Sequence, residues 1–293
     1  MSRDRVLVCG SNGRLGQSVL RTIGSDHALS ASRYDEPPVE GFDHVRLSGD
    51  GGLPAFAFEH CFAVINVAGR TSGSAEELYD ANVELPTVLA RAARENGVSK
   101  FVQVGSFSVY GEAEVIGPAT PEGPCTEYGR SKALADAALL QLGAPEFLVE
   151  IVRLPFLFSA DQPNLLEPLL AFASRARVFP VCDPESKRSM ITYDDAAAVL
   201  VNAAADDVSG ITRAADPQPF TISLLSRITQ EEGGKPWHLL TISAPAIKLV
   251  RIMAPGIARR LFQSSFLAAG DNRAGDRPLG LEATIRAIVR LAA

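Results

Sequence analysis

Two side chains that can exchange and stabilise a proton stand four residues apart in Thr126-Glu-Tyr-Gly-Arg-Ser-Lys132. The apolar pattern of residues 133–140 predicts a helix, and this spacing places Tyr128 and Lys132 on one face of it. A phenol titrates near ~10, so at neutral pH it exchanges protons readily only if a nearby positive charge stabilises the phenolate. The Lys132 ammonium can supply that charge. The pair indicates acid/base chemistry on a sugar or alcohol oxygen, provided that a second motif supports it.

A glycine-rich turn near the N-terminus is that second motif. The apolar run Arg5-Val-Leu-Val-Cys9 predicts a strand, and residues 17–23 have a helical pattern. Between them lies Gly10-Ser-Asn-Gly13-Arg-Leu-Gly16. A tight turn between a strand and a helix brings backbone N–H groups and a helix N-terminus to a pyrophosphate. The turn therefore predicts a dinucleotide cofactor held by Gly10, Asn12, Gly13, Arg14, Leu15 and Gly16.

The residue after the second predicted strand indicates which dinucleotide is bound. Arg33 follows the apolar run of residues 28–32, at the position where dinucleotide folds contact the adenosine ribose. An arginine there suits a 2′-phosphate, and Arg14 could assist it. We therefore expect NADP, with NAD as the alternative. A solvated arginine at a strand end is the competing interpretation.

Strand-like and helix-like segments alternate along the first half of the chain. Residues 62–68, 101–105 and 147–153 read as strands, and a helix opens at the capping box Ser74-Ala-Glu-Glu77, ends at Asn96-Gly97 and is bent by Pro86. This alternation predicts an α/β fold with a doubly wound parallel (Rossmann) sheet. The alternation of strand-like and helix-like segments becomes less regular after Pro155. We expect residues 1–160 to form the cofactor domain, with elements around 189–215 returning to it, and residues 161–293 to form mostly a smaller, interleaved substrate lobe.

The substrate lobe has weaker local signals. Residues 164–176 and 244–262 look helical, and residues 237–242 look like a strand. From Lys235 to the end the chain carries a net charge of +6, against −12 for the preceding part. Ordinary surface variation explains this asymmetry, and contact with an anionic ligand or a membrane surface is the alternative.

Composition excludes several classes of protein. A chain of 293 residues with 46% hydrophobic residues can bury a large core, and a net charge of −6 disfavours nucleic acid as a partner. The four cysteines are scattered without metal-ligand spacing, so we expect no metal site, reduced thiols and a cytoplasmic protein. No signal-peptide core and no uncharged apolar run of membrane-spanning length is present, so no transmembrane segment is expected.

The glycine turn, Ser106-Phe-Ser-Val-Tyr-Gly and Tyr128-x-x-x-Lys132 occur in register, each on the expected element. Together they resemble the extended short-chain dehydrogenase/reductases, the NAD-dependent epimerase/dehydratase family that includes nucleotide-sugar 4-epimerases and 4-ketoreductases. The resemblance implies that Ser106, Tyr128 and Lys132 are catalytic and that Tyr128 and Lys132 also touch the cofactor. Ser108 is a candidate substrate contact that could substitute for Ser106, and a structural serine is the alternative. The family's dehydratases carry Asp-Glu where this chain has Phe107 and Ser108, so dehydration is not expected.

The same resemblance assigns further residues. Asp50 would meet the adenine edge, although a solvated loop carboxylate is the alternative, and Ala68 would line the cofactor pocket. Asn82 would support the active site or serve the bend of its helix. Arg188 would bind a nucleotide-sugar diphosphate, which suits its guanidinium fork. Arg153 and Asn164 are weaker substrate-side candidates. Phe158-Ser-Ala160 replaces the family's usual Tyr-Gly-Pro, which leaves the substrate open.

These residues predict an NAD(P)-dependent enzyme that oxidises or reduces a secondary alcohol or ketone of a nucleotide sugar at C4, as an epimerase or a reductase. A reductase of a non-sugar ketone, such as a steroid or flavonoid, is one alternative. A non-catalytic NADP-binding regulatory protein on the same fold is another. The expected partner is a small-molecule substrate, and a homodimer is a candidate assembly.

Overall fold

The computed structural model describes residues 4–49, 51–161, 178–181, 183–234, 238–241 and 264–292. A seven-stranded sheet lies at its centre, in the order β11-β7-β5-β4-β1-β2-β3. All neighbouring strands in it are parallel. This confirms the predicted doubly wound α/β fold. The strands are β1 (Arg5–Cys9), β2 (Ala28–Ser32), β3 (Asp43–Arg46), β4 (Cys61–Asn66), β5 (Lys100–Ser106), β7 (Leu148–Leu154) and β11 (Gly210–Arg213).

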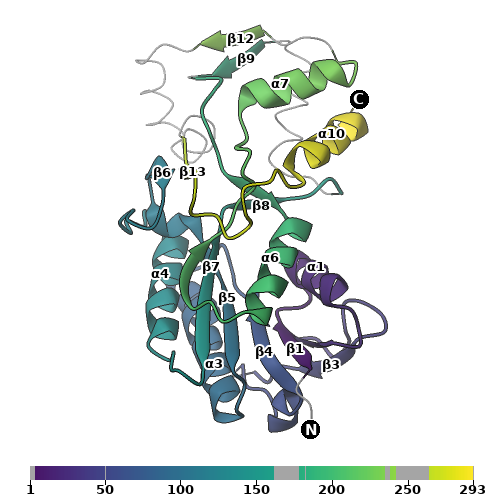
Figure 1. Ribbon diagram of the computed structural model, residues 1–293, viewed down its shortest axis with the longest axis vertical. Coiled ribbons are helices and arrows are strands. Elements are labelled where there is room, and N and C mark those ends of the chain that lie inside the picture. Colours follow the sequence, from purple (N-terminus) through teal and green to yellow (C-terminus); the bar gives the residue numbers. More distant parts are fainter. Residues whose placement is uncertain are drawn as a thin grey trace.

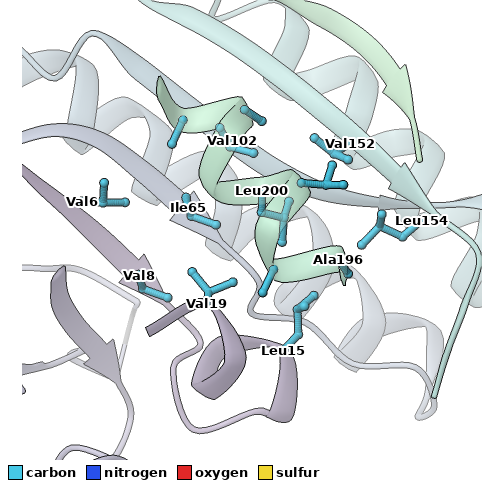
Figure 2. Packing of buried hydrophobic residues seen from close by; sticks show 14 of the residues in the cluster. Val6, Val8, Leu15, Val19, Ile65, Val102, Val152, Leu154, Ala196 and Leu200 are labelled. Atoms are coloured by element: carbon cyan, nitrogen blue, oxygen red, sulfur yellow. The ribbon is translucent and has the colours of Figure 1, made fainter. Parts of the chain in front are cut away.

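Helices cover both faces of the sheet (Figure 1). On one face, α1 (Arg14–Ile23) and α6 (Tyr193–Ala205) pack against each other, and on the other face lie α3 (Leu85–Glu95) and α4 (Glu127–Leu140). Figure 2 shows the core beneath α1 and α6, where Val19 and Leu200 meet Ile65 and Val102 of the strands. Burial of this apolar surface is what holds α1, and with it the glycine turn, against the sheet.

The segment before α3 differs from a simple bent helix. The capping box of Ser74 and Glu77 is present and opens α2 (Ala75–Tyr79). A π-helical turn, η2 (Asp80–Glu84), then leads into α3, which has Pro86 in its first turn. Proline has no N–H to donate to the carbonyl four residues earlier. The expected bend thus takes the form of a wider helical turn just before the proline.

A second group of elements lies beyond the carboxyl ends of the strands (Figure 1). Its core contains Phe158, Met190, Leu225, Ile285 and Val289. The expected strand at residues 237–242 contains β12, which pairs with β9. The expected helices at residues 164–176 and 244–262 lie outside the described residues. The domain boundary at residue 160 stays a prediction.

The remaining elements are short strands, single turns and two longer helices. They are 3₁₀ helix η1 (Ala55–Phe58), 3₁₀ helix η3 (Phe107–Tyr110), β6 (Val115–Ile116), β8 (Phe156–Phe158), β9 (Val178–Val181), β10 (Met190–Thr192), α7 (Ile222–Glu231), β12 (His238–Thr241), β13 (Phe266–Leu267) and α10 (Leu281–Ala292).

Residues 271–274 run alongside the outer strand β11. The Arg273 N–H donates to the Arg213 carbonyl at 2.7 Å, and the Asn272 amide exchanges two hydrogen bonds with the backbone of Ala215. The Arg213 guanidinium also pairs with Asp271 at 2.9 Å. This segment therefore covers the edge of the sheet.

Two expectations from composition can be compared with the described part of the chain. Within it, no helix has both the length and the apolar character needed to cross a bilayer. Cys9 and Cys61 are buried free thiols, and Cys125 is an exposed one. Cys182 lies outside the described residues.

Candidate active site

The glycine turn is closed tightly on its inner side. Gly10 has φ +84°, and a Cβ atom there would lie 2.5 Å from the backbone nitrogen of Ala68. A Cβ atom on Gly16 would lie 2.5 Å from the carbonyl oxygen of Gly10, whereas one on Gly13 would meet only that same oxygen, at 3.4 Å. The structure thus brings the predicted cofactor residues Gly10, Gly13, Gly16 and Ala68 together, with the open side at Gly13.

The residues of this turn fit a dinucleotide. Gly13 caps α1 without a side-chain hydrogen bond, and the first turn of α1 contains no acidic residue. The first N–H groups of a helix have no partner within it and attract anions. The Oδ1 atom of Asn12 is buried and has no hydrogen-bond donor among the described residues. Leu15 is buried in the core below the turn, so it supports the turn from beneath.

Arg14 contacts Tyr193, the first residue of α6. The Arg14 guanidinium carbon lies 5.8 Å from the centroid of the Tyr193 ring, and its Nη1 atom lies 3.5 Å from the Ser159 hydroxyl. The Arg33 side chain follows β2 and is exposed. The expectation that both arginines flank the adenosine ribose stays a prediction.

The predicted catalytic side chains come from two neighbouring elements. Ser106 ends β5, and Thr126 caps α4 by accepting a hydrogen bond from the Gly129 N–H at 3.0 Å. This cap starts the helix so that Tyr128 lies in its first turn. The Ser106 hydroxyl is a neighbour that lowers the pKa of the Tyr128 phenol, and the Ser106 Oγ accepts a hydrogen bond from the Ser108 N–H at 3.2 Å.

A cavity of about 420 Å³ opens beside this pair. Ser106, Ser108, Tyr128 and Arg188 all line it, so the structure brings three hydroxyls and one arginine to a common space. Sequence reasoning did not find the apolar part of the wall, because its members come from different elements and carry no motif. That part consists of Phe107, Leu154, Pro155, Phe156, Leu157 and the ring of Tyr193.

Lys132 lies behind Tyr128 and is only 4% exposed. Its Nζ atom donates to the carbonyl oxygen of Val104 on β5 at 2.6 Å. Burial lowers the pKa of this ammonium, and the negative charge of Asp136 acts in the opposite direction. Burial raises the pKa of the Tyr128 phenol, the hydrogen bond with Ser106 lowers it, and the charge of Asp136 raises it further. The phenol is therefore protonated at neutral pH in this structure.

Asn82 connects the π-helical turn to α4. It is 1% exposed, and its Nδ2 atom donates to the Ser131 hydroxyl at 2.9 Å. Its Oδ1 atom accepts from the Arg70 N–H at 2.8 Å. Ser131 stands between Tyr128 and Lys132 in the sequence, so Asn82 holds the helix that carries both.

Arg153 is not a cavity residue. It is 1% exposed, and its guanidinium donates to Asp136 at 2.8 Å, to the Tyr110 hydroxyl at 2.9 Å and to Glu122. The expectation of a substrate-side role is therefore corrected, because the side chain is buried and its hydrogen bonds go to three protein side chains. Sequence reasoning missed Asp136, although its position four residues after Lys132 was the signal that could have revealed it.

Two predicted site residues, Asp50 and Asn164, lie outside the described residues. A second cavity, of about 310 Å³, lies at the opposite end of the sheet beside Lys100 and Asp206, and none of the predicted site residues lines it. Among the described residues, no three His, Cys, Asp or Glu side chains gather as metal ligands.

A family model described as the NAD dependent epimerase/dehydratase family matches residues 6–214. The chain belongs to this family. The result confirms the resemblance to extended short-chain dehydrogenase/reductases.

Two relatives and one solved structure illustrate the similarity. The UDP-glucose 4-epimerase of Vibrio cholerae is 25% identical over 213 residues, which span 67% of this chain and 65% of that protein. The ceramide reductase of Caulobacter vibrioides is 26% identical over 267 residues, 87% of this chain and 76% of that protein. The UDP-glucuronic acid 4-epimerase of Bacillus cereus, solved in complex with NAD, has a TM-score of 0.73 at 14% identity, with 98% of each chain covered. At this identity the structural likeness shows the fold alone.

Proposed function

We propose that this chain is an NAD(P)-dependent epimerase or reductase that acts on a secondary alcohol or ketone of a nucleotide sugar, at C4 of the sugar. One observation carries the proposal: Arg188 lines the same cavity as Ser106 and Tyr128. A guanidinium suits a diphosphate, and the hydroxyl pair suits a reacting sugar oxygen. Membership of the epimerase/dehydratase family supports this combination.

Tyr128 is the general acid and base in this proposal. In reduction its phenol gives a proton to the oxygen of the forming alcohol, and in oxidation the phenolate takes that proton back. Ser106, which lines the same cavity as Tyr128, donates a hydrogen bond to the same substrate oxygen. Lys132 keeps a positive charge behind the phenol and holds the nicotinamide ribose. The bound nicotinamide supplies the hydride chemistry.

NADP is the proposed cofactor. Support comes from Arg33, which is exposed at the end of β2 and forms no ion pair or side-chain hydrogen bond within the described part of the chain. A guanidinium without a protein partner is available for a 2′-phosphate. The Bacillus cereus relative was solved with NAD, so NAD is the alternative that a binding experiment has to compare.

A reductase of an apolar ketone is the second candidate. The wall formed by Phe107, Leu154, Pro155, Phe156 and Leu157 favours it, because apolar side chains contribute most to the binding of apolar ligands. The similarity to a ceramide reductase supports the same candidate. Arg188 favours the nucleotide sugar, because a guanidinium forms charge-assisted hydrogen bonds with a phosphate and not with an apolar ligand.

A ligand panel distinguishes the two candidates. Thermal unfolding is measured with NADP present and with UDP-, GDP- and dTDP-sugars or apolar ketones added one at a time. A ligand that binds only the folded state raises the unfolding temperature. We expect a nucleotide sugar to raise it and the ketones to leave it unchanged. If every nucleotide sugar leaves it unchanged while an apolar ketone raises it, the proposed substrate class is wrong.

A further inference from the structure

Three ionisable side chains share the inner face of α4. Tyr128, Lys132 and Asp136 are spaced four residues apart, so their side chains line up on the face of the helix that packs against β5 and β7. Lys132 is 4% exposed and Asp136 is 2% exposed. Side chains four apart on a helix have their Cβ atoms about 5–6 Å apart. Lys132 and Asp136 are therefore buried neighbours on one face of the helix.

The Lys132 ammonium and the Asp136 carboxylate both have hydrogen-bonding positions without a partner among the described residues. An ammonium has three donors, and the one acceptor recorded for Lys132 within the described residues is the neutral Val104 carbonyl. The Oδ1 atom of Asp136 is buried and has no hydrogen-bond donor in that same part of the chain. The Oδ2 atom accepts from Arg153 at 2.8 Å. Burial raises the pKa of the Asp136 carboxyl, and the guanidinium of Arg153, which does not lose its proton in a protein, opposes this rise.

Other charged groups surround the pair. From β7, Arg153 contacts Asp136, the carboxylate of Glu122 and the Tyr110 hydroxyl. From β11, Arg213 donates to the same hydroxyl at 2.6 Å and pairs with Asp271. The negative charges of Glu122 and Asp271 thus have arginine partners. Asp136 is the carboxylate that also acts on the buried ammonium of α4.

We propose that Asp136 is a positioning residue of the active site, whose buried carboxylate keeps Lys132 in its ammonium form behind Tyr128. The carboxylate acts through Lys132 and does not touch the substrate. Burial lowers the pKa of Lys132, and Asp136 is the charge that opposes this effect. Asp136 also raises the pKa of Tyr128 directly, whereas the Lys132 ammonium that it maintains favours the phenolate. A change in turnover alone would not separate these two opposite effects on Tyr128. The role of Lys132 in catalysis rests on the proposed function. The effect of the Asp136 carboxylate on the protonation of Lys132 does not.

The ionisation of Lys132 can be followed directly by NMR. The chain has few lysines, Lys100, Lys132, Lys187, Lys235 and Lys248, so the signals of ε-¹³C-labelled lysine are easily separated. The Lys132 signal is the one that disappears in Lys132→Met. We expect Asp136→Asn to lower the midpoint of its titration by about one pH unit or more. Asp136→Glu, which keeps the charge, should restore the midpoint toward that of the parent.

Lys100 provides an internal control in the same spectra. It is also buried, but its ammonium pairs with Glu150 at 3.1 Å at the other end of the sheet, so its ¹³C chemical shift at a given pH should be the same in Asp136→Asn and in the parent. An unchanged Lys132 midpoint in the folded Asp136→Asn protein would overturn the proposal. The NMR titrations are carried out without substrate or cofactor, so their result does not depend on the outcome of the ligand panel.

A reciprocal measurement does not require the Asp136 variant to fold. Coupling between two sites is equal in both directions. Lys132→Met should therefore raise the pKa of the Asp136 carboxyl, followed by its ¹³C signal, by the same amount by which Asp136→Asn lowers that of Lys132. An Asp136 pKa that is identical in the parent and in Lys132→Met would also overturn the proposal.

Discussion

The Nζ atom of Lys132 on α4 lies 2.6 Å from the carbonyl oxygen of Val104 on β5. Ser106 is two residues further along the same strand, and Tyr128 is one helical turn before Lys132. The lysine thus ties the helix that carries the phenol to the strand that carries the serine. Five predictions test whether this arrangement is catalytic and which ligands it serves.

Tyr128→Phe should lower kcat by about 10²–10⁴, the usual contribution of positioned proton transfer. Cofactor affinity should not change, because the ring still fills its place. Tyr79 is exposed on α2, so Tyr79→Phe removes the same hydroxyl elsewhere and serves as the control. Steady-state turnover on a verified substrate and cofactor titration provide the two measurements. Turnover close to that of the parent in Tyr128→Phe would exclude the acid/base role.

Lys132→Met should stabilise the cofactor-free protein while weakening NADP binding. Burial lowers the pKa of Lys132, so holding the ammonium in the folded state costs stability at neutral pH. Replacement by an apolar side chain removes this cost. Asp136 keeps its hydrogen bond from Arg153 at 2.8 Å, so no buried carboxylate is left unpaired, and Val104 keeps a hydrogen bond from the Gln103 side chain. We expect the unfolding temperature at pH 7 to rise by about 2–4 °C.

The pH dependence gives the control for that prediction. A lowered lysine pKa costs stability below the folded-state pKa, and the cost vanishes as the pH rises through the unfolded value near ~10.4. The difference in unfolding temperature between Lys132→Met and the parent should therefore shrink at alkaline pH. A variant that is less stable than the parent at pH 7 would show that the lysine supports the fold.

Arg33→Asp should reverse the cofactor preference. The parent should bind NADP(H) more tightly than NAD(H), because a charge-assisted contact to the 2′-phosphate is stronger than a neutral one. The aspartate would repel that phosphate and accept hydrogen bonds from a 2′-hydroxyl. Dissociation constants for the two cofactors, measured by fluorescence titration, test this. Equal affinities of the parent for the two cofactors would contradict the proposed preference for NADP.

Arg188→Ala should raise the KM for a nucleotide sugar far more than it lowers kcat. The diphosphate is remote from the reacting carbon, so its contacts contribute similarly to the ground state and the transition state. Arg227→Ala removes an exposed arginine of α7 and should leave both constants unchanged. An unchanged KM in Arg188→Ala would mean that this arginine does not bind the substrate.

Two glycines of the same turn should respond differently to alanine. A Cβ on Gly16 would lie 2.5 Å from the Gly10 carbonyl oxygen and 2.6 Å from the Cα of Ser11, so Gly16→Ala should destabilise the fold. Gly13→Ala should leave the unfolding temperature nearly unchanged, because its nearest contact is 3.4 Å. The added methyl group should still weaken cofactor binding. A Gly13→Ala protein with parent affinity would show that the cofactor does not approach this turn.

The sequence predicted correctly those elements that depend only on local sequence patterns. β1 and β2 have the predicted bounds, because each is an apolar run that ends in a turn. β3 was missed because it lies at the edge of the sheet, and its sequence Asp43–Arg46 has no apolar run. The edge strand β11, with only four residues, was not identified as a strand for the same reason.

The interior of the site depends on contacts between distant segments. The family resemblance assigned Arg153 to the substrate side, and its place in the glycine turn assigned Arg14 to the cofactor. Their partners, Asp136 for Arg153 and Tyr193 for Arg14, lie on other elements. Only the packing of α4 on β7, and of α1 on α6, determines which way each arginine points.

The strip of chain along β11 also affects how copies of this protein can meet. An uncovered edge strand is a template on which another chain can add a strand, with fibrous aggregation as the extreme outcome. Hydrogen bonding of Arg273 to Arg213 occupies that template at one side of the sheet. At the other side, β3 is four residues long, and its charged ends pair with Arg5 and Asp35. Within the described residues, neither edge of the sheet is a long, uncovered strand to which another molecule could add a strand. Self-association by strand addition is therefore disfavoured.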